Sequence, residues 1–191
     1  MAISDPVLQK LIKKYPAPTF TDRSAFLFED LIESIISQQL SVKASDTIFK
    51  RFKLLFKHKT FPSPQEVLET NEQNIRTAGI SFQKISYIKN IATAFANDKI
   101  NIEEIKNMTD EEVILYLTKL KGVGKWTAEM ILIFTLNRPD VFSLGDLGLR
   151  RAVERLYGIT DHKEILTLSE TWKPNRSTAS WYLWRSLENS F

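Results

Sequence analysis

The sequence predicts an all-α fold, and three features of the 191-residue chain support this prediction. Apolar side chains recur at spacings of three and four residues in most segments, as they do on one face of a helix. Capping residues stand before these segments, and glycine or proline stands after them. No stretch of useful length alternates apolar and polar residues like a half-buried strand. We therefore expect about ten helices joined by short loops.

Each expected helix carries an apolar stripe, a capping signal or both. Serine, threonine and aspartate accept hydrogen bonds from the free N–H groups of a first helical turn, and glutamate or glutamine three residues later completes a capping box. In chain order, the signals are a stripe at Leu8–Ile12, a helix over residues 24–38, an N-cap at Ser41, capping boxes at Ser63–Glu66 and Thr70–Gln73, a stop at Gly79, a helix over residues 81–97, a capping box at Thr109–Glu112, helices over residues 125–136 and 146–156, a short helix or turn closing at Ser169–Glu170, and a helix over residues 176–188. No linker, low-complexity segment or repeat divides the chain.

The composition excludes several classes of function. Without cysteine the chain cannot form disulfides, thiolate zinc sites, cysteine nucleophiles or iron–sulfur clusters. Its two histidines, His58 and His162, are too few for a histidine-rich metal site. The first residues lack the basic and apolar regions of a signal peptide, and no apolar run is long enough to span a membrane. We therefore expect an intracellular protein without a membrane partner.

A glycine hairpin, Leu120-Lys121-Gly122-Val123-Gly124, joins two expected helices. Such a turn at a helix N-terminus leaves backbone N–H groups available and lets a phosphate approach closely, and Lys121 and Lys125 add positive charge. The chain lacks the Gly-x-Gly-x-x-Gly motif of dinucleotide sites, and Trp126 stands where a P-loop has its hydroxyl residue. A nucleic-acid backbone is the phosphate that fits best. Two glycines can also serve simply as a tight turn between helices.

The net charge of +3, from 26 basic and 23 acidic residues, gives only weak support for a polyanion partner. Any basic surface that meets nucleic acid must therefore be local.

Four blocks of sequence, in this order, resemble the helix-hairpin-helix superfamily of DNA glycosylases, and most closely the DNA-3-methyladenine glycosylase II family. They are Ile35–Ala44, Leu120–Ala128, Asp140–Asp146 and Trp172–Trp184, and the resemblance spans about Phe26 to Trp184. It implies two helical lobes with the helix-hairpin-helix motif, at about residues 110–136, beside a DNA-binding cleft. Residues 20–140 are expected to form one lobe, and residues 1–19 with 141–191 the other, which carries the catalytic aspartate.

The resemblance also implies a reaction. Members of the superfamily flip a damaged nucleotide out of the duplex and cleave its N-glycosidic bond. Asp146 takes the place of the catalytic aspartate, whose negative charge can stabilise an oxocarbenium-like sugar and can orient or deprotonate a water. Asp146 is also a suitable N-cap for the helix that follows it, so both roles remain open.

Residue 126 distinguishes two types of glycosylase. Relatives that also cut the DNA backbone place a Schiff-base lysine two residues after the second hairpin glycine, where this chain has Trp126. Lys125 is one position away, and adjacent residues on a helix point about 100° apart. We therefore expect a monofunctional glycosylase without lyase activity.

By the same resemblance, Trp126 and Trp184 are expected to form the aromatic walls of the base pocket. Indole faces attract an electron-poor or cationic alkylated purine, with a cation–π effect of roughly 0.5–2 kcal/mol. Met130 and Leu147 are expected to complete the pocket, and they replace aromatic residues that some relatives carry, which leaves the lesion range open. The neighbouring Trp181 leaves open which ring faces the base.

The resemblance also implies which residues contact DNA. Gln39, with Leu40 second, matches the residue that fills the gap left by the flipped nucleotide, although the same residues can simply end a helix. The backbone of DNA is expected to contact Gly122, Val123, Gly124, Lys125 and Thr127. The carbonyls of Thr118, Leu120 and Val123 match positions that hold a monovalent cation, Na⁺ or K⁺, in relatives. No other cofactor is expected.

These inferences together predict a monofunctional DNA glycosylase that excises alkylated purines of the 3-methyladenine type in base-excision repair. We expect it to act as a monomer on double-stranded DNA with a damaged base, in the cytoplasm or nucleoid of a prokaryote or the nucleus of a eukaryote. One alternative is a bifunctional glycosylase and lyase for oxidised bases, against which Trp126 argues. The other is a non-catalytic DNA-binding protein, against which Asp146 and the paired tryptophans argue.

Overall fold

A computed structural model describes residues 4–56 and 61–188. These residues form helices and loops and contain no strand, which confirms the all-α prediction. The chain divides into two compact units, one of residues 23–131 and one of residues 1–22 with 132–191. The first unit thus ends at residue 131, whereas the sequence suggested a lobe that ends at residue 140. His58 lies outside the described residues.

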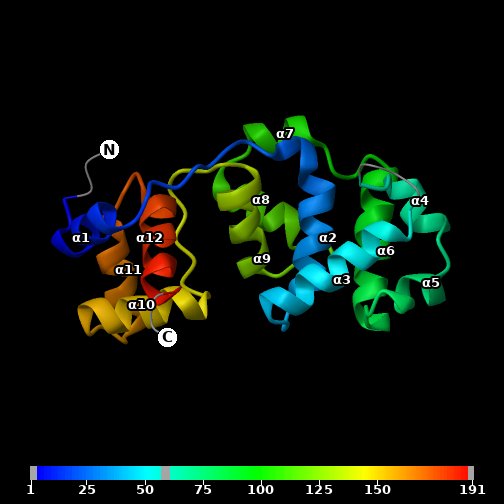
Figure 1. Ribbon diagram of the computed structural model, residues 1–191. Coiled ribbons are helices and arrows are strands. Elements are labelled where there is room, and N and C mark those ends of the chain that lie inside the picture. The colour runs from blue at the N-terminus through cyan, green and yellow to red at the C-terminus, as the bar shows by residue number, and fades with distance from the viewer. Residues whose placement is uncertain (1–3, 57–60, 189–191) are drawn as a thin grey trace. The chain divides into compact units, whose positions relative to one another are not determined.

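The unit of residues 23–131 is built around α2 (Figure 1). This helix packs against α3 and α6, and Leu31, Ile32 and Ile35 on its inner face are fully buried. Burying each such side chain contributes about 1.5–3 kcal/mol, so this face is a large contribution to the stability of the unit. The helices of the unit are η1 (Ser24–Phe26), α2 (Leu27–Ser37), α3 (Val42–Leu54), α4 (Pro64–Glu69), α5 (Glu72–Thr77), α6 (Phe82–Ala96), α7 (Ile102–Asn107), α8 (Asp110–Leu117) and α9 (Lys125–Met130).

Most capping signals act as the sequence predicts. Both bonds of the capping box are present at Ser63, before α4, and at Thr109, before α8. The capping box expected at Thr70 is wrong, because Thr70 ends α4 and the side chain of Asn71 caps α5 instead. The short helix α7 was not anticipated, and Asn101 caps it.

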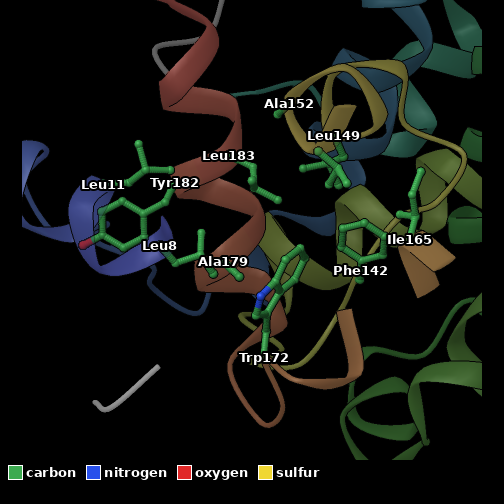
Figure 2. Packing of buried hydrophobic residues seen from close by; sticks show 11 residues of the cluster. Leu8, Leu11, Phe142, Leu149, Ala152, Ile165, Trp172, Ala179, Tyr182 and Leu183 are labelled. Atoms are coloured by element: carbon green, nitrogen blue, oxygen red, sulfur yellow. The ribbon is translucent and has the colours of Figure 1, made fainter. Parts of the chain in front are cut away.

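The second unit packs its helices around α12 (Figure 1), which contacts α1 and α10. Tyr182 points toward Leu11 of α1, and Leu183 points toward Leu149 of α10 (Figure 2). The helices of this unit are α1 (Pro6–Lys14), α10 (Leu147–Tyr157), α11 (His162–Glu170) and α12 (Arg176–Glu188), with a π-helical turn, η2 (Ile131–Thr135), before α10 in the chain.

Trp172 lies at the centre of this second core and is almost fully buried. The ring of Phe142 meets its indole edge to face, with ring centres 5.6 Å apart (Figure 2). The indole N–H donates to the carboxylate of Asp5 at 3.1 Å, and the same carboxylate caps α1 through the N–H groups of Val7 and Leu8. A buried indole N–H needs such a partner, so Trp172 also fixes the start of the N-terminal helix.

The helix expected over residues 125–136 changes its winding partway. It is α-helical to Met130 and then continues as the π-helical turn η2. Asn137 adopts a left-handed conformation, with φ of 54°, and the N–H of Arg138 donates to the carbonyl of Leu132 at 2.8 Å. The left-handed residue therefore ends the helix two positions before Pro139, in agreement with the stop that the sequence indicated.

The segment between η2 and α10 is anchored to the start of α12. The guanidinium of Arg176 donates to both carboxylate oxygens of Asp140, at 2.8 and 3.0 Å. The hydroxyl of Ser177 donates to the carbonyl of Arg138 and accepts from the N–H of Val141. These bonds fix the backbone that leads to Asp146.

Burial of the Asp140 carboxyl would raise its pKa, but the hydrogen bonds and charge of Arg176 outweigh that effect and lower the pKa below its usual value. Arg176 is therefore engaged by Asp140 within its own unit.

Within the described parts of the chain, we find no helix that is both long and apolar enough to cross a membrane.

We predict that Asp140→Asn lowers the free energy of unfolding by about 1–3 kcal/mol at pH 7, since it removes a carboxylate from charge-assisted hydrogen bonds. A carboxyl whose pKa is lowered by folding stabilises above its unfolded pKa of about 3.9, and this contribution is lost as the pH falls. The difference between the two proteins should therefore shrink between about pH 5 and pH 2.

Urea unfolding across this pH range measures the effect. Asp161→Asn is the matched control, because Asp161 is an exposed N-cap and asparagine caps equally well. An Asp140→Asn protein as stable as the wild type at pH 7 would contradict the anchoring role.

Candidate DNA-binding and catalytic site

The glycine hairpin connects α8 to α9 and rests against α6. Gly122 has φ of +89°, and a Cβ atom there would lie 2.4 Å from the ring of Tyr87 on α6. The N–H of Lys121 donates to the side-chain oxygen of Asn90, also on α6, at 3.0 Å. Only glycine satisfies both the backbone angle and the close approach of Tyr87. The shape of the hairpin is therefore fixed by its packing, before any ligand binds.

The residues that follow Gly122 differ in what they expose. Gly124 is the N-cap of α9, in an extended conformation, and no side chain caps the helix from this position. Lys125 and Trp126 are exposed, whereas the side chains of Val123 and Thr127 are buried. Val123 and Thr127 can therefore meet a phosphate only through their backbone N–H groups, while Lys125 can use its charged side chain.

The loop after α2 lies beside this hairpin. The side-chain amide of Gln38 donates to the carbonyl of Gly122 at 3.0 Å. Gln39 is left-handed, with φ of 59°, and Leu40 beside it is exposed. A left-handed residue other than glycine costs about 1–3 kcal/mol, so the surrounding contacts must hold Gln39 in this conformation.

A groove of about 540 Å³ runs between the loop after α2 and the hairpin. Its lining brings together residues that the sequence assigned to the wedge, the phosphate contact and the base pocket. The lining residues are Ser37, Gln38, Gln39, Leu40, Gly122, Gly124, Trp126 and Thr127. The structure therefore gathers the expected wedge, the hairpin and one expected pocket wall on one surface of a single unit.

The carbonyls expected to hold a cation belong to the turn between α8 and α9. The carbonyl of Leu120 accepts the N–H of Val123 at 3.1 Å, and Thr118 is the C-cap of α8. Neutral backbone carbonyl oxygens are the donors that Na⁺ and K⁺ take in proteins, so this donor set fits a monovalent cation. The described residues contain no group of three or more histidine or acidic side chains that could hold a metal ion.

Asp146 lies in the second unit, as the N-cap of α10. Its Oδ1 atom accepts the N–H of Leu149 at 2.7 Å and the indole N–H of Trp184 at 2.9 Å. A Cβ atom on Gly148 would lie 3.0 Å from this oxygen and 3.2 Å from the indole of Trp184. A side chain at position 148 would therefore crowd both the carboxylate and the indole. Asp146 therefore caps α10, which is the structural role that the sequence left open.

The indole that donates to this carboxylate packs against a second aromatic ring. Trp184 packs against Phe134 with ring centres 5.6 Å apart and planes inclined by 31°, and 42% of Phe134 is exposed. Trp181 packs instead edge to face against Tyr182. Trp184 is therefore the tryptophan of α12 that lies at Asp146.

The remaining predicted pocket residues fall in both units. Leu147 is half exposed at the first turn of α10, in the unit of Asp146. Met130 is half-buried at the end of α9, in the unit of the hairpin.

Sequence reasoning missed Phe134 and Gly148. Phe134 belongs to the apolar run Met130–Leu136, which suggests core packing, and only the structure shows that its ring is exposed. Gly148 looks in the sequence like one end of a glycine-bracketed turn, and its contact with Trp184, 36 positions further along the chain, has no local signal.

Comparison with known proteins places this chain in a family. Residues 32–176 match the family model described as HhH-GPD superfamily base excision DNA repair protein. The chain is 39% identical over 183 residues to DNA-3-methyladenine glycosylase 1 of Schizosaccharomyces pombe, and the match covers 94% of this chain and 80% of that protein.

Solved structures agree with this match. The S. pombe 3-methyladenine DNA glycosylase Mag1 in complex with abasic DNA superposes with a TM-score of 0.87 at 36% identity, covering 98% of this chain and 94% of that one. The DNA-3-methyladenine glycosidase of Bacillus halodurans gives a TM-score of 0.78 at 30% identity, covering 97% and 91%. The chain belongs to the HhH-GPD superfamily of base-excision DNA repair proteins.

Proposed function

We propose that this chain is a monofunctional DNA glycosylase that excises alkylated purines from double-stranded DNA by hydrolysis. The observation that carries the proposal is the carboxylate of Asp146, held by the N–H groups of Leu149 and Trp184, with the indole of Trp184 packed against the ring of Phe134. The relatives named as 3-methyladenine glycosylases support alkylated purines as the substrate class. We further propose that the protein acts as a monomer on cellular DNA and needs no membrane partner.

The chemistry follows from the charge that develops during bond cleavage. As the N-glycosidic bond breaks, its electron pair leaves with the purine and the sugar becomes oxocarbenium-like. The negative charge of Asp146 stabilises this cation, and a water adds to C1′ and gives up a proton to the carboxylate of Asp146. Because the N–H groups of Leu149 and Trp184 already hold Oδ1, the carboxylate needs little reorientation when the substrate arrives.

The aromatic rings give the site a preference for alkylated bases. An alkylated purine that carries positive charge stacks favourably on indole faces, with roughly 0.5–2 kcal/mol for each good contact. We assign this role to Trp184, which packs against Phe134, and to Trp126, and we assign apolar contacts with the base to Leu147 and Met130. Additional selectivity comes from the weak glycosidic bond of such lesions and from their easier extrusion.

The unit of residues 23–131, which contains the glycine hairpin, carries the residues that we assign to DNA binding. We assign the backbone phosphate to the N–H groups around Gly122 and Gly124 and to the charged side chain of Lys125, and we assign the wedge to Gln39 with Leu40 beside it. A Na⁺ or K⁺ ion held by the carbonyls of Thr118, Leu120 and Val123 would add positive charge next to that phosphate. The groove between the loop and the hairpin is the surface that supports these assignments.

We assign hydrolysis without backbone cleavage on the basis of the residue at position 126. Trp126 occupies the Schiff-base position, and Lys125 lies 3.8 Å from Glu129 on the exposed side of α9. A covalent intermediate with the sugar needs an amine at C1′, so we assign the nucleophile to water.

We predict that Asp146→Asn lowers the rate of base release at least about 100-fold while the protein stays folded, since asparagine caps a helix as well as aspartate does. The assay follows release of 7-methylguanine and hypoxanthine from duplex DNA under single-turnover conditions, with and without alkali. Wild-type protein should give strand breaks only after alkali. Breaks without alkali would show a lyase, no release of any base would favour a binding protein, and wild-type release by Asp146→Asn would remove the catalytic assignment.

A second prediction concerns the bond between Trp184 and Asp146. Trp184→Phe keeps an aromatic ring but removes the indole N–H, so the carboxylate loses one of its fixed donors. We expect a fall of about tenfold in kcat with a smaller change in KM, because the lost bond orients the charge in the transition state. Trp181→Phe is the matched control on the same helix and should leave both parameters within about twofold. An unchanged kcat in Trp184→Phe would refute the role of this bond.

The hairpin glycines should respond differently to substitution by serine. Gly122→Ser should lower the free energy of unfolding by about 1–3 kcal/mol, because its Cβ meets Tyr87 and its φ is positive. Gly124→Ser should leave stability unchanged, since a Cβ there meets no atom within 4 Å and serine is a good N-cap. It should nevertheless weaken DNA binding about tenfold, or 1.4 kcal/mol, by blocking close approach of the phosphate.

Urea unfolding and fluorescence anisotropy with labelled duplex measure these two effects. Equal losses of stability in the two variants, or unchanged DNA affinity in Gly124→Ser, would contradict this division of roles.

A further inference from the structure

The side chain of Lys84 on α6 reaches the end of α2 and binds two of the carbonyls there. Its ammonium group donates to the carbonyl of Ile36 at 2.8 Å and to that of Gln38 at 2.7 Å. The carbonyls at a helix C-terminus lack partners within the helix and carry partial negative charge. A half-buried ammonium is thus placed where the backbone leaves the helix and enters the loop that carries Gln39.

The position of this contact matters because the next residue is left-handed. Gln38 leaves the helix with ψ of 128°, and Gln39 follows with φ of 59°. The N–H of Leu40 donates to the carbonyl of Ser37 at 3.1 Å and closes the turn. Lys84 fixes the carbonyl of Gln38, which belongs to the peptide group immediately before Gln39. Its contact therefore sets the direction in which Gln39 leaves the helix.

A second bond holds the same residue through its side chain. The side-chain amide of Gln38 donates to the carbonyl of Gly122 in the hairpin, while its backbone carbonyl accepts from Lys84. Gln38 is thereby tied to both α6 and the hairpin. Gln39, which lines the groove, projects from a backbone that these two contacts fix.

The engagement of Lys84 also separates it from lysines that can meet a phosphate directly. Two of its three N–H donors point to backbone carbonyls of its own unit, and burial lowers the pKa of its side chain. Lys125, by contrast, has a side chain that is 75% exposed. Lys84 is placed to shape the loop and Lys125 to contact a ligand.

We propose that Lys84 is a positioning residue that holds the loop after α2 in the conformation from which Gln39 enters the DNA stack. This inference rests on the proposed function, because it assigns Lys84 a role in base extrusion by the same site. It predicts that removal of Lys84 impairs the opening of paired DNA and spares bond cleavage on a base that needs no extrusion.

The chain offers a matched control on the same helix. Lys89 of α6 donates in the same way to the carbonyls of Leu68 and Thr70 at the end of α4, both at 2.6 Å. Burial lowers the pKa of Lys89 as well. The end of α4 carries no residue that lines the groove. Lys89→Met therefore reproduces the general cost of losing a lysine clamp, and Lys84→Met adds any effect specific to the loop.

The experiment compares single-turnover release of 7-methylguanine from a paired duplex and from the same oligonucleotide as a single strand. Lys84→Met should lower the duplex rate about tenfold and change the single-strand rate less than about twofold, and Lys89→Met should leave the ratio of the two rates at its wild-type value. Gln39→Ala should change the ratio of the two rates as Lys84→Met does. The double variant should show no further fall in the duplex rate, since both changes impair insertion of the same residue.

A second measurement does not depend on catalysis. Duplex DNA with an abasic analogue and 2-aminopurine in the opposite strand reports insertion of the wedge as a change in fluorescence at saturating protein. We expect Lys84→Met to lose most of this change and Lys89→Met to keep it. If the wild type inserts the wedge but releases no base, the proposed function is wrong. The fluorescence of Lys84→Met then decides by itself whether Lys84 positions the loop.

Three results would overturn the inference. Equal losses of rate on duplex and single strand, or the same shift of ratio in Lys89→Met, would show a general loss of structure. Additive effects of Lys84→Met and Gln39→Ala would show independent roles. A salt dependence of duplex binding that weakens by about one unit in Lys84→Met, with normal wedge fluorescence, would make Lys84 a phosphate contact instead.

Discussion

The bond between the indole of Trp184 and the carboxylate of Asp146 is the interaction on which the arrangement of the second unit depends. It joins the first turn of α10 to α12, and Gly148 gives the ring room that a side chain there would crowd. The backbone that leads to Asp146 is tied to the start of the same α12 by Ser177. The charge that we assign to catalysis is therefore positioned by one helix, and that helix is held in turn by the core around Trp172.

A carboxylate that caps a helix can also act in catalysis, since both roles need a negative charge that is held in one orientation. The N–H of Leu149 binds the ionised form and keeps the negative charge at the helix N-terminus, where the helix dipole favours it. A cap of this kind contributes about 0.5–2 kcal/mol to folding. Loss of a preorganised charge at a transition state costs about 3–4 kcal/mol. The catalytic role that we propose for Asp146 is therefore worth more free energy than its helix cap, and the bonds from Leu149 and Trp184 hold the carboxylate in place.

Sequence reasoning succeeded where the signal is local and failed where it depends on distant contacts. The capping boxes at Ser63 and Thr109 and the N-cap at Asp146 need only neighbouring residues, and all three form. The N-cap expected at Thr70 is wrong because asparagine is the stronger N-cap residue, and Asn71 stands next to Thr70.

The site followed the same rule. The hairpin and Asp146 could be found from short motifs and from resemblance to a family. The choice between Trp181 and Trp184 could not, because it depends on how α12 is turned against α10, and neither could the contact from Lys84 to a carbonyl 46 positions away.

The glycines of the site are of two kinds. Some stand where packing leaves little room for a side chain, and others stand in open space. Gly122 has a positive φ and stands where a Cβ atom would collide with Tyr87, so the fold itself requires it, and a Cβ atom on Gly148 would crowd Trp184 and Asp146. Gly124 and Gly145 have no atom within 4 Å of the position of a Cβ, and neither has a positive φ. Packing and backbone strain therefore give no reason for glycine at these two positions. Gly124 lies in the groove to which we assign the phosphate contact, and there the proposed close approach of a ligand backbone would favour glycine.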